Sequence, residues 1–269
     1  MQNIKEYVKE KKEYLKKYFD NLNRDVTLAI IQVNDNPDSC IYIKDKMKDA
    51  EEIGVKTYLY RLPSIIPEQE LLKFIEHTNE DESVDGILVQ MPLPKHIDEY
   101  KVKLMIAPEK DVDGFNPISF VNPCTPQGIL TYLINNNVEL KGKNAVVIGR
   151  SEIFGKSMAK MLIDTDCTVT LMHSKTPLEE QKKYVANADI VVIAIGRAFY
   201  LDNRFSFKKN AIIIDAGMNR DENNKLCGDT NRHLPVAFQS PVPGGVGLLT
   251  KLTIFENLLK LIRRKHDEY

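Results

Sequence analysis

Short apolar runs alternate with longer amphipathic stretches along the first half of the chain. The runs at 26–33, 56–62 and 86–91 are rich in β-branched and other apolar residues, which predicts strands. Helical spacing predicts helices at 40–53 and 67–79, between those strands. Strands that alternate with helices are typical of an α/β fold with largely parallel sheets.

The second half repeats this alternation with more strongly apolar strands. Residues 144–149, 168–173, 189–196 and 211–217 are near-continuous apolar runs, so we expect strands buried on both faces of a doubly wound sheet. A Pro- and Asn-rich stretch predicts a hinge near Asn122. A closing helix at 250–264 has one apolar stripe, formed by Leu252, Phe255, Leu259 and Ile262.

The first 23 residues form an amphipathic pattern that only Lys11 interrupts. The segment lacks the apolar core of a secretory signal, and we expect a helix with a solvated basic face. Docking of that face on a membrane is the alternative. Its apolar stripe consists of Ile4, Tyr7, Val8, Leu15, Tyr18, Phe19 and Leu22.

Composition excludes several classes of protein. With a formal net charge of −1, no overall field attracts the chain to nucleic acid or to an anionic membrane. No apolar run reaches the roughly 20 residues that a membrane-spanning helix needs. The four cysteines form no CxxC pair and have no histidine at a ligand spacing, which predicts no metal site, no disulfide framework and a cytoplasmic location.

A candidate nucleotide site follows the first strand of the second half. Gly149 permits a tight turn after that strand, and Gly155 permits close packing of the next helix, which we expect to begin near Lys156. A helix N-terminus binds phosphate through its unpaired N–H groups and its dipole. Ser151 replaces the middle glycine of the usual G-x-G-x-x-G, so by itself the loop is equally well explained as a packed turn.

The end of the next strand indicates which dinucleotide binds. NAD-preferring sites place an acidic residue there to hold the ribose 2′-hydroxyl. This chain has His173, Ser174 and Lys175 instead, with Arg150 in the neighbouring loop. Hydroxyl and cationic donors suit a 2′-phosphate, so we predict NADP rather than NAD.

Tyr42 and Lys46 are candidate catalytic residues on the first helix of the first half. Their i, i+4 spacing places an aromatic ring and an amine on one helix face. The amine could act in proton transfer, because the pKa of a lysine responds strongly to burial. Spacing alone favours the alternative, a surface pair on a lysine-rich helix.

Three further features add polar or backbone groups to this candidate site. Gln90 follows a buried strand, at the strand end where α/β proteins bind ligands. Asp113, in the sequence KDVDGF, is either a turn cap or an acceptor for the N–H groups of a heterocycle. The sequence PVPGGVG, residues 241–247, contains three glycines in four residues, which allows backbone to approach a flat ligand closely.

With these residues, the chain resembles the bifunctional methylenetetrahydrofolate dehydrogenase/methenyltetrahydrofolate cyclohydrolase family. The resemblance extends from about Val26 to Thr250 and rests on nine blocks in the family order. These blocks are NDNPDSCIYIKDK, DGILVQMPLP, KDVDGFNP, PCTPQG, GRSEIFGKSMA, TVTLMHSKT, ADIVVIAIG, IIIDAGMN and SPVPGGVGLLT.

The resemblance implies a role for each matching position of the folate site. Lys46 would be the catalytic lysine, with Tyr42 stacking on or orienting the folate and Gln90 hydrogen-bonded to Lys46. Asp113 would bind the pterin. The remaining folate contacts would come from Val89, Met91, Pro243, Gly244, Gly245, Val246 and Gly247.

The resemblance also implies a cofactor site and a domain organisation. Gly149, Arg150 and Ser151 match the phosphate loop, Ser174 the 2′-phosphate contact, and Met218 a backbone contact to the nicotinamide. The expected fold is α/β with two domains. An N-terminal α/β catalytic domain, 1–122 with 250–269, binds folate, and a Rossmann-type doubly wound NADP-binding domain occupies 123–249. The expected partners are tetrahydrofolate one-carbon derivatives and a second copy of the chain in a homodimer.

The chain departs from the family pattern at several positions, so more than one function stays open. Asn34, Ser157, Thr230 and Leu248 replace the usual glycine, proline, valine and proline, and IDAGMN replaces IDVGIN. Leu248, beside the expected folate slot, leaves a monofunctional NADP-dependent dehydrogenase as an alternative. The sequence also leaves open a non-catalytic NADP-binding regulator and a dehydrogenase of a small acid such as shikimate.

Overall fold

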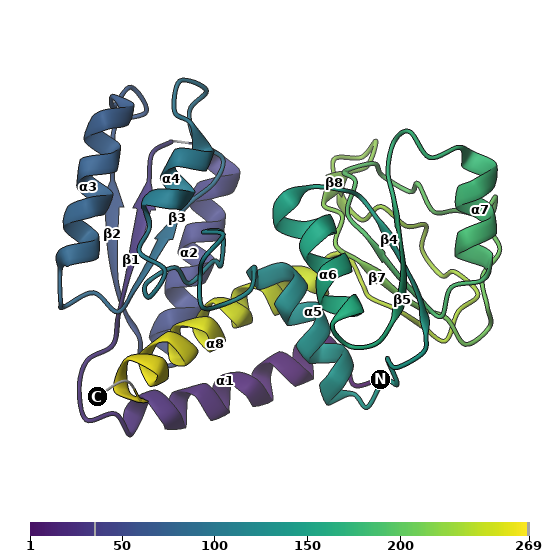
Figure 1. The fold of residues 1–269 in the computed structure, drawn as a ribbon, viewed down its shortest axis with the longest axis horizontal. Coiled ribbons are helices and arrows are strands. Elements are labelled where there is room, and N and C mark those ends of the chain that lie inside the picture. The colour runs from purple at the N-terminus through teal and green to yellow at the C-terminus, as the bar shows by residue number, and fades with distance from the viewer. Residues whose placement is uncertain (35, 268–269) are drawn as a thin grey trace. The chain divides into compact units, whose positions relative to one another are not determined.

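The computed structural model describes residues 1–34 and 36–267, which form two compact units (Figure 1). One unit comprises Met1–Val8 with Thr125–Thr250, and the other comprises Lys9–Cys124 with Lys251–Tyr269. Residue 35 of the first family block and residues 268–269 of the predicted catalytic domain lie outside the described residues. The predicted domain ranges differ from these units at residues 1–8, 123–124 and 250. The domain ranges stay a prediction.

The Lys9–Cys124 unit is built on a three-stranded parallel sheet of order β2-β1-β3. Thr27 pairs with Lys56 on one side of the central strand, and Leu28 pairs with Gly86 on the other. The strands are β1 (Thr27–Gln32), β2 (Lys56–Arg61) and β3 (Gly86–Val89), and the helices are α2 (Pro37–Glu52), α3 (Glu68–Glu80) and α4 (Glu99–Met105).

Both faces of this sheet are covered. Ala29 and Ile31 point to a core that α3 and α4 complete with Leu71, Ile75 and Val102. The opposite face meets α8 (Val246–Asp267): a Cβ added to Gly86 would lie 2.8 Å from Leu258 and 2.5 Å from Val112. Only glycine therefore fits where the strand approaches these two side chains.

The Thr125–Thr250 unit contains a five-stranded parallel sheet of order β10-β7-β6-β4-β5. The chain passes from β4 to β5 at one edge and then returns across β4 to β6, so the strand order reverses at β4. Ligands of open α/β sheets bind at such a reversal. Its elements are α5 (Cys124–Asn135), β4 (Asn144–Ile148), η1 (Glu152–Lys156), α6 (Ser157–Ile163), β5 (Thr168–Met172), α7 (Leu178–Ala186), β6 (Ile190–Ile193), β7 (Ile212–Asp215), β8 (Asn219–Arg220), β9 (Leu226–Cys227) and β10 (Phe238–Gln239).

Successive side chains of the central strands enter two different cores, as a doubly wound sheet requires. Ala145 and Val147 face α5 and α6. Val146 and Ile148 face the opposite core, which includes Val185 of α7 (Figure 1). The predicted α/β fold with a Rossmann-type sheet is confirmed.

Some sequence-based expectations were wrong in detail. The run at 168–173 forms β5, an edge strand whose residues are mostly partly exposed, because only β4 pairs with it. The predicted hinge near Asn122 stays a prediction; it lies just before α5, which begins at Cys124. The closing helix α8 begins at Val246 rather than at 250, inside the glycine-rich segment.

The amphipathic N-terminal segment forms helix α1 (Ile4–Asp20), as predicted. Its apolar stripe is largely buried, including Ile4, Leu15 and Phe19. Among the described residues, no helix has both the length and the apolar character needed to cross a membrane.

Candidate active site

Lys46 and Gln90 meet where α2 passes the carboxyl end of β3. The Lys46 amine donates a 3.0 Å hydrogen bond to Gln90 Oε1. Gln90 Nε2 donates to the carbonyl of Met91 at 2.6 Å, which fixes the amide with its oxygen toward the lysine. The predicted contact between these two residues is present in the structure.

Asp113 lies near this pair, on a loop held by a dense set of hydrogen bonds. The Asp111 carboxylate accepts from the N–H groups of Gly114 at 3.0 Å and Asn116 at 2.8 Å. Asn257, on α8, donates from Nδ2 to the carbonyls of Val112 at 2.9 Å and residue 122 at 3.1 Å. These hydrogen bonds fix the loop on both sides of Asp113.

Burial, more than the neighbouring charges, favours a neutral Lys46 amine. Burial lowers the pKa of Lys46 from its usual value of about 10.5, whereas the nearby Asp113 and Cys124 raise it and the Lys251 ammonium lowers it further. Lys251, on α8, is held by ion pairs with Asp45 at 3.3 Å and Asp49 at 3.4 Å. A proton-accepting lysine needs this kind of environment.

Burial shifts the pKa of Asp113 in the opposite direction to that of Lys46. Burial raises the pKa of its carboxyl group, while the Lys46 amine and the Cys124 thiol lower it. Cys124 is itself buried, and its N–H donates to the Asp113 carbonyl at 3.2 Å. The pKa of the thiol is raised, chiefly by burial, so the thiol is kept in its uncharged form.

The other predicted folate residues belong to both compact units. Tyr42 lies one turn before Lys46 on α2 and is half-buried, and Val89 and Met91 flank Gln90 at the end of β3. Pro243, Gly244, Gly245, Val246 and Gly247 belong to the Thr125–Thr250 unit. Gly245 packs so closely that an added Cβ would lie 2.2 Å from the Pro241 carbonyl oxygen, and Gly244 has a φ of +94°.

The loop after β4 has the geometry of a dinucleotide phosphate loop. Gly149 has a φ of +123°, and an added Cβ would lie 2.5 Å from the carbonyl oxygen of Ala194. An added Cβ at Gly155 would lie 2.0 Å from the Gly149 oxygen, so both positions require glycine. The helix begins with a π-turn at Glu152, before the expected start near Lys156, and the Ser151 hydroxyl caps it by accepting from the Gly155 N–H at 3.5 Å.

Arg150 and Ser174 lie at matching positions of adjacent strands. Ile148 pairs with Met172 in the parallel register, and each predicted residue follows its strand by two positions. Both side chains are exposed at the carboxyl edge of the sheet. Met218 follows the end of β7 at the same edge and is 51% exposed.

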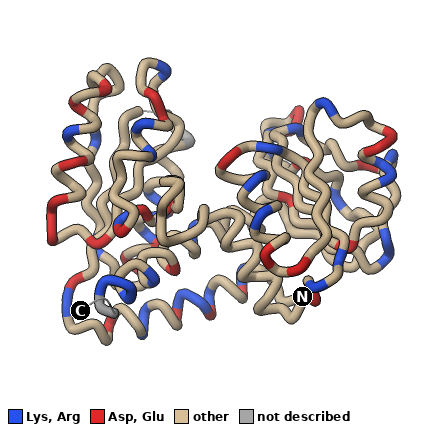
Figure 2. Tube along the Cα trace, in the orientation of Figure 1, with Lys and Arg blue, Asp and Glu red and all other residues tan. Residues whose placement is uncertain are grey.

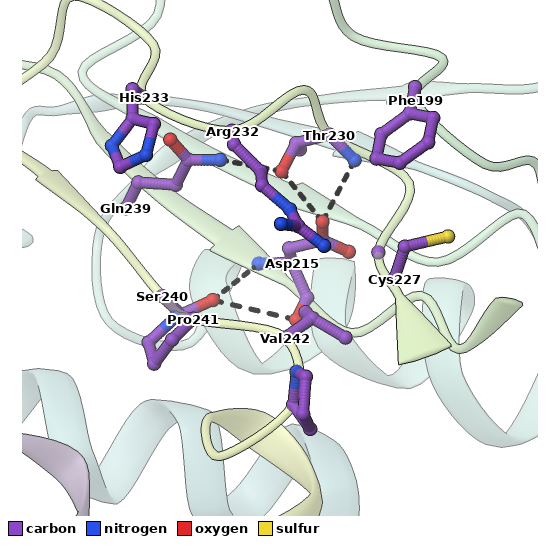
Figure 3. A pocket seen from close by; sticks show the side chains of 12 residues that line it. Phe199, Asp215, Cys227, Thr230, Arg232, His233, Gln239, Ser240, Pro241 and Val242 are labelled. Atoms are coloured by element: carbon purple, nitrogen blue, oxygen red, sulfur yellow. Dashed lines mark hydrogen bonds between the residues drawn. The ribbon is translucent and has the colours of Figure 1, made fainter. Parts of the chain in front are cut away.

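A cavity of about 410 Å³ lies near the ends of β7 and β10 (Figure 3). Buried Asp215 forms one wall and accepts from the Thr230 hydroxyl at 2.7 Å. Desolvation raises the pKa of Asp215, and its hydrogen bonds with Thr230, residue 229 and Gly217 oppose that rise. Exposed Arg232 and His233 form the outer rim.

Comparison with known proteins assigns both halves of the chain. The catalytic-domain model of the tetrahydrofolate dehydrogenase/cyclohydrolase family matches residues 1–113, and its NAD(P)-binding-domain model matches residues 123–266. The chain belongs to this family. It is 44% identical to the bifunctional protein FolD of Listeria innocua over 249 residues, which cover 88% of this chain and 87% of that protein.

Solved structures of the tetrahydrofolate dehydrogenase/cyclohydrolase family agree over almost the whole chain. The bifunctional FolD enzyme of Campylobacter jejuni has a TM-score of 0.93 and 37% identity, with 98% of each chain covered. A Trypanosoma brucei methylenetetrahydrofolate dehydrogenase-cyclohydrolase, solved with NADP and an inhibitor, has a TM-score of 0.92 and 30% identity. The matched region covers 98% of this chain and 97% of the Trypanosoma brucei chain.

Three of the departures from the tetrahydrofolate dehydrogenase/cyclohydrolase pattern have local structural explanations. Asn34 donates to the Pro92 carbonyl at 2.6 Å, a bond that glycine could not make. The Ser157 N–H, which proline would lack, donates to the Phe154 carbonyl. Thr230 gives a hydroxyl that joins Asp215 to Gln239, whose amide donates to it at 2.7 Å.

Sequence reasoning missed several residues that complete these sites. Cys124 was counted only among the four cysteines and within a family block, and Asn257 and Lys251 lie on a helix that was identified by its apolar stripe. Asn257 had one detectable signal, because it is a polar residue within that apolar helix and is buried. Within residues 1–34 and 36–267, no group of three His, Cys, Asp or Glu residues could hold a metal ion.

The charged residues are scattered, in agreement with the neutral overall balance. Lysine and arginine alternate with aspartate and glutamate along both units in the view of Figure 2. Helix α1, for example, carries Lys12, which pairs with Asp49 at 2.6 Å and Glu52 at 2.7 Å. Part of the basic face of α1 is thus paired within the protein.

Proposed function

We propose that this protein is a bifunctional NADP-dependent methylenetetrahydrofolate dehydrogenase and methenyltetrahydrofolate cyclohydrolase. The observation that carries the proposal is the enclosed Lys46 amine, which is hydrogen-bonded to Gln90 and interacts electrostatically with the Asp113 carboxylate. A lysine with a lowered pKa at the ligand-binding end of a strand is suited to proton transfer. The family relation supports the same pair of reactions.

The residues of the Thr125–Thr250 unit fit NADP. The positive φ of Gly149 and the tight packing of Gly155 shape the turn between β4 and the following helix N-terminus, where the phosphates would bind. Arg150 and Ser174 would hold the 2′-phosphate, and Met218 would contact the nicotinamide through its backbone. When bound, NADP supplies the ring carbon that accepts a hydride from 5,10-methylenetetrahydrofolate.

The residues near Lys46 would orient the folate for both reactions. Tyr42 would stack on the folate, and the Asp113 carboxylate would accept hydrogen bonds from the pterin N–H groups. Val89, Met91 and the segment of Pro243, Gly244, Gly245, Val246 and Gly247 would line the slot. This orientation is the main contribution of the protein to the dehydrogenase step, because hydride transfer depends strongly on the alignment of the two rings.

Lys46 acts in the second reaction, the hydrolysis of the 5,10-methenyl cation to 10-formyltetrahydrofolate. Water adds to the methenyl carbon and loses a proton, and the ring then opens when the C–N bond to one folate nitrogen breaks. The neutral amine of Lys46 accepts the proton of the attacking water and returns it to the departing nitrogen. The hydroxyl group left on the carbon loses its own proton to solvent as the formyl C=O forms, so the reaction releases one proton overall. Gln90 holds the amine in place through its carbonyl oxygen.

The NADP preference predicts the effect of a new carboxylate at the 2′-phosphate contact. Ser174→Asp should raise the KM for NADP at least about tenfold, because a negative charge within a few ångströms of the phosphate costs more than ~1.4 kcal/mol. The KM for NAD should rise far less. Steady-state rates with each dinucleotide measure both constants.

The matched control for this prediction is Ser206→Asp, which adds the same charge to an exposed serine before β7, away from the carboxyl edge. It should leave both constants unchanged. An unaltered NADP to NAD preference in Ser174→Asp would remove Ser174 from the cofactor site.

We also propose a cytoplasmic homodimer with the domain ranges 1–122 with 250–269 and 123–249. The two family models, which match residues 1–113 and 123–266, support a boundary near residue 122, and the compact unit of Lys9–Cys124 with Lys251–Tyr269 supports the return of the C-terminal residues to the catalytic domain. The homodimer is what the family resemblance implies. The paired charges on α1 and the balanced net charge give no reason to expect a membrane or nucleic acid partner.

A paired assay on the purified protein tests the proposal. One reaction contains 5,10-methylenetetrahydrofolate with NADP, and the other contains preformed 5,10-methenyltetrahydrofolate without cofactor. We expect NADPH formation in the first and accelerated loss of the methenyl compound in the second. Activity in the first alone would identify a monofunctional dehydrogenase, and no activity in either would reject an enzymatic function.

A further inference from the structure

Two buried aspartates lie among the loops at the carboxyl ends of β6 and β7. Asp215 ends β7 and is 1% exposed, and Asp229 follows β9 and is fully buried. Neither residue takes part in the proposed proton transfer or binding of the folate. A buried carboxylate is unfavourable unless hydrogen bonds satisfy it, so the partners of these two residues indicate what they do.

Asp229 binds the loop that follows β6. Its Oδ2 accepts from the N–H groups of Ile195 at 2.6 Å and Gly196 at 3.2 Å, and its Oδ1 accepts from the N–H of Arg197 at 2.6 Å. Oδ1 also accepts from Asn219 Nδ2 at 2.9 Å. One carboxylate therefore joins the end of β6 to the residues that follow β7.

Asp215 binds the segment that contains Asp229. Its Oδ1 accepts from the N–H groups of Gly217 at 2.8 Å and Asp229 at 3.0 Å. Its Oδ2 accepts from both the N–H and the hydroxyl of Thr230, the latter drawn in Figure 3. Asp215 thus holds Asp229 in position, and Asp229 holds the β6 loop.

The packing around the two carboxylates leaves no room for adjustment. An added Cβ at Gly217 would lie 2.3 Å from Asp229 Cγ, and one at Gly228 would lie 2.0 Å from Asp215 Oδ2. Met218 lies between two fixed residues, because Gly217 bonds to Asp215 and Asn219 bonds to Asp229. Its backbone is fixed while its side chain stays half-exposed.

These loops lie beside the phosphate loop. Strand β6 is hydrogen-bonded to β4 on one side and to β7 on the other, and Gly149 packs against the carbonyl of Ala194 at the end of β6. A dinucleotide that starts at the β4 loop and runs along the carboxyl edge toward β7 must pass the loops that Asp229 holds.

We propose that Asp229 is a positioning residue for hydride transfer: it fixes the loops after β6 and β7, against which the nicotinamide ring is oriented. The inference rests on the proposed function. Asp229 contacts no reactant itself and acts through the backbone of 195–197 and through Asn219. Cofactor affinity comes mainly from the phosphate contacts at the β4 and β5 loops, so a defect at Asp229 appears in the hydride-transfer rate.

Asp229→Asn tests this inference with little change of shape. An amide has only one acceptor oxygen, so its NH2 group must face either the N–H groups of Ile195 and Gly196 or the donors on Arg197 and Asn219. We expect the dehydrogenase kcat to fall about 10- to 100-fold, because small misalignments of reacting atoms cost rates of this order. The KM for NADP should change less than about threefold, and cofactor-free cyclohydrolase activity should stay at the wild-type level. The deuterium isotope effect on kcat, measured with substrate labelled at the methylene bridge, should rise.

Asp189→Asn is the matched control. Asp189 also accepts a backbone N–H, from Asn144 at 2.9 Å, and a bond from Lys208 at 2.7 Å. It lies before β6, at the amino edge of the same sheet. The same substitution there should leave both activities unchanged even if it lowers the melting temperature.

Asn219→Ala provides a second, milder variant in case Asp229→Asn does not fold. It removes one of the four hydrogen bonds to Asp229, so we expect the same pattern with a severalfold loss of dehydrogenase kcat. Equal losses of both activities in this variant, or full dehydrogenase activity in folded Asp229→Asn, would overturn the inference. Absence of dehydrogenase activity in the wild-type protein would instead overturn the proposed function.

Discussion

Lys46→Met should lose cyclohydrolase activity by about 10³-fold or more while the protein stays folded. A positioned acid–base group contributes roughly 10²- to 10⁴-fold, and in the proposed mechanism Lys46 both accepts and returns the proton. Methionine has a similar length and no titratable group. It also removes the cost of burying an amine, so the melting temperature should not fall. Loss of the methenyl absorbance, measured without cofactor, gives the rate.

Lys44→Met is the control for this prediction. Lys44 lies on the same helix but is exposed, and it belongs to none of the hydrogen bonds around Gln90. It should keep wild-type cyclohydrolase activity. Dehydrogenase activity of Lys46→Met should fall by no more than about tenfold, because hydride transfer needs orientation rather than the amine. Retained cyclohydrolase turnover in Lys46→Met would refute the assignment.

Asp113→Asn should lower kcat/KM for the folate substrates of both reactions by about 100-fold. Each hydrogen bond between a carboxylate and a pterin N–H is worth about 1.5–3 kcal/mol, and the amide can accept at only one oxygen. The pKa of Asp113 is raised by burial, so replacing it removes an unfavourable buried charge. The free energy of unfolding should therefore stay the same or increase while activity falls.

The same variant should alter the pH dependence of the cyclohydrolase. Asp113 raises the pKa of Lys46, so its removal should move the rise in rate with pH to lower pH. Asp25→Ala removes an exposed carboxylate that pairs with Lys56 at 2.5 Å, and it should change neither activity nor profile. Normal folate kcat/KM in Asp113→Asn would exclude a pterin-binding role.

Periodicity predicted the elements whose burial follows a regular pattern. The strands β1, β4 and β6 lie within the predicted runs because their residues, apart from Asn144 at the start of β4, are buried on both faces. Strand β5 has a similar sequence but lies at a sheet edge, and position in a sheet depends on long-range pairing that the local pattern does not contain. The two-residue strands β8, β9 and β10 are too short to produce a periodic signal.

The candidate site was predictable where a side chain stands at the end of a regular element. Gln90 follows β3 directly, and Lys46 lies on α2, so strand-end and helix-spacing arguments both applied. Asn257 acts through a contact with a residue 135 positions earlier in the sequence, and Asp229 through a contact with one 34 positions earlier. No local pattern reports such contacts, and only the folded chain brings these groups together.

A titration of the Lys46 amine tests the central claim most directly. Nuclear magnetic resonance of protein labelled with ¹³C at lysine Cε, with Lys46→Met as the assignment standard, follows each ammonium as pH rises. We expect one resonance, absent from the variant, with a pKa clearly below the usual value of about 10.5, because burial and the Lys251 ammonium both lower it. A Lys46 resonance that titrates at or above that value would mean an ammonium at neutral pH, and the lysine could not then be the base.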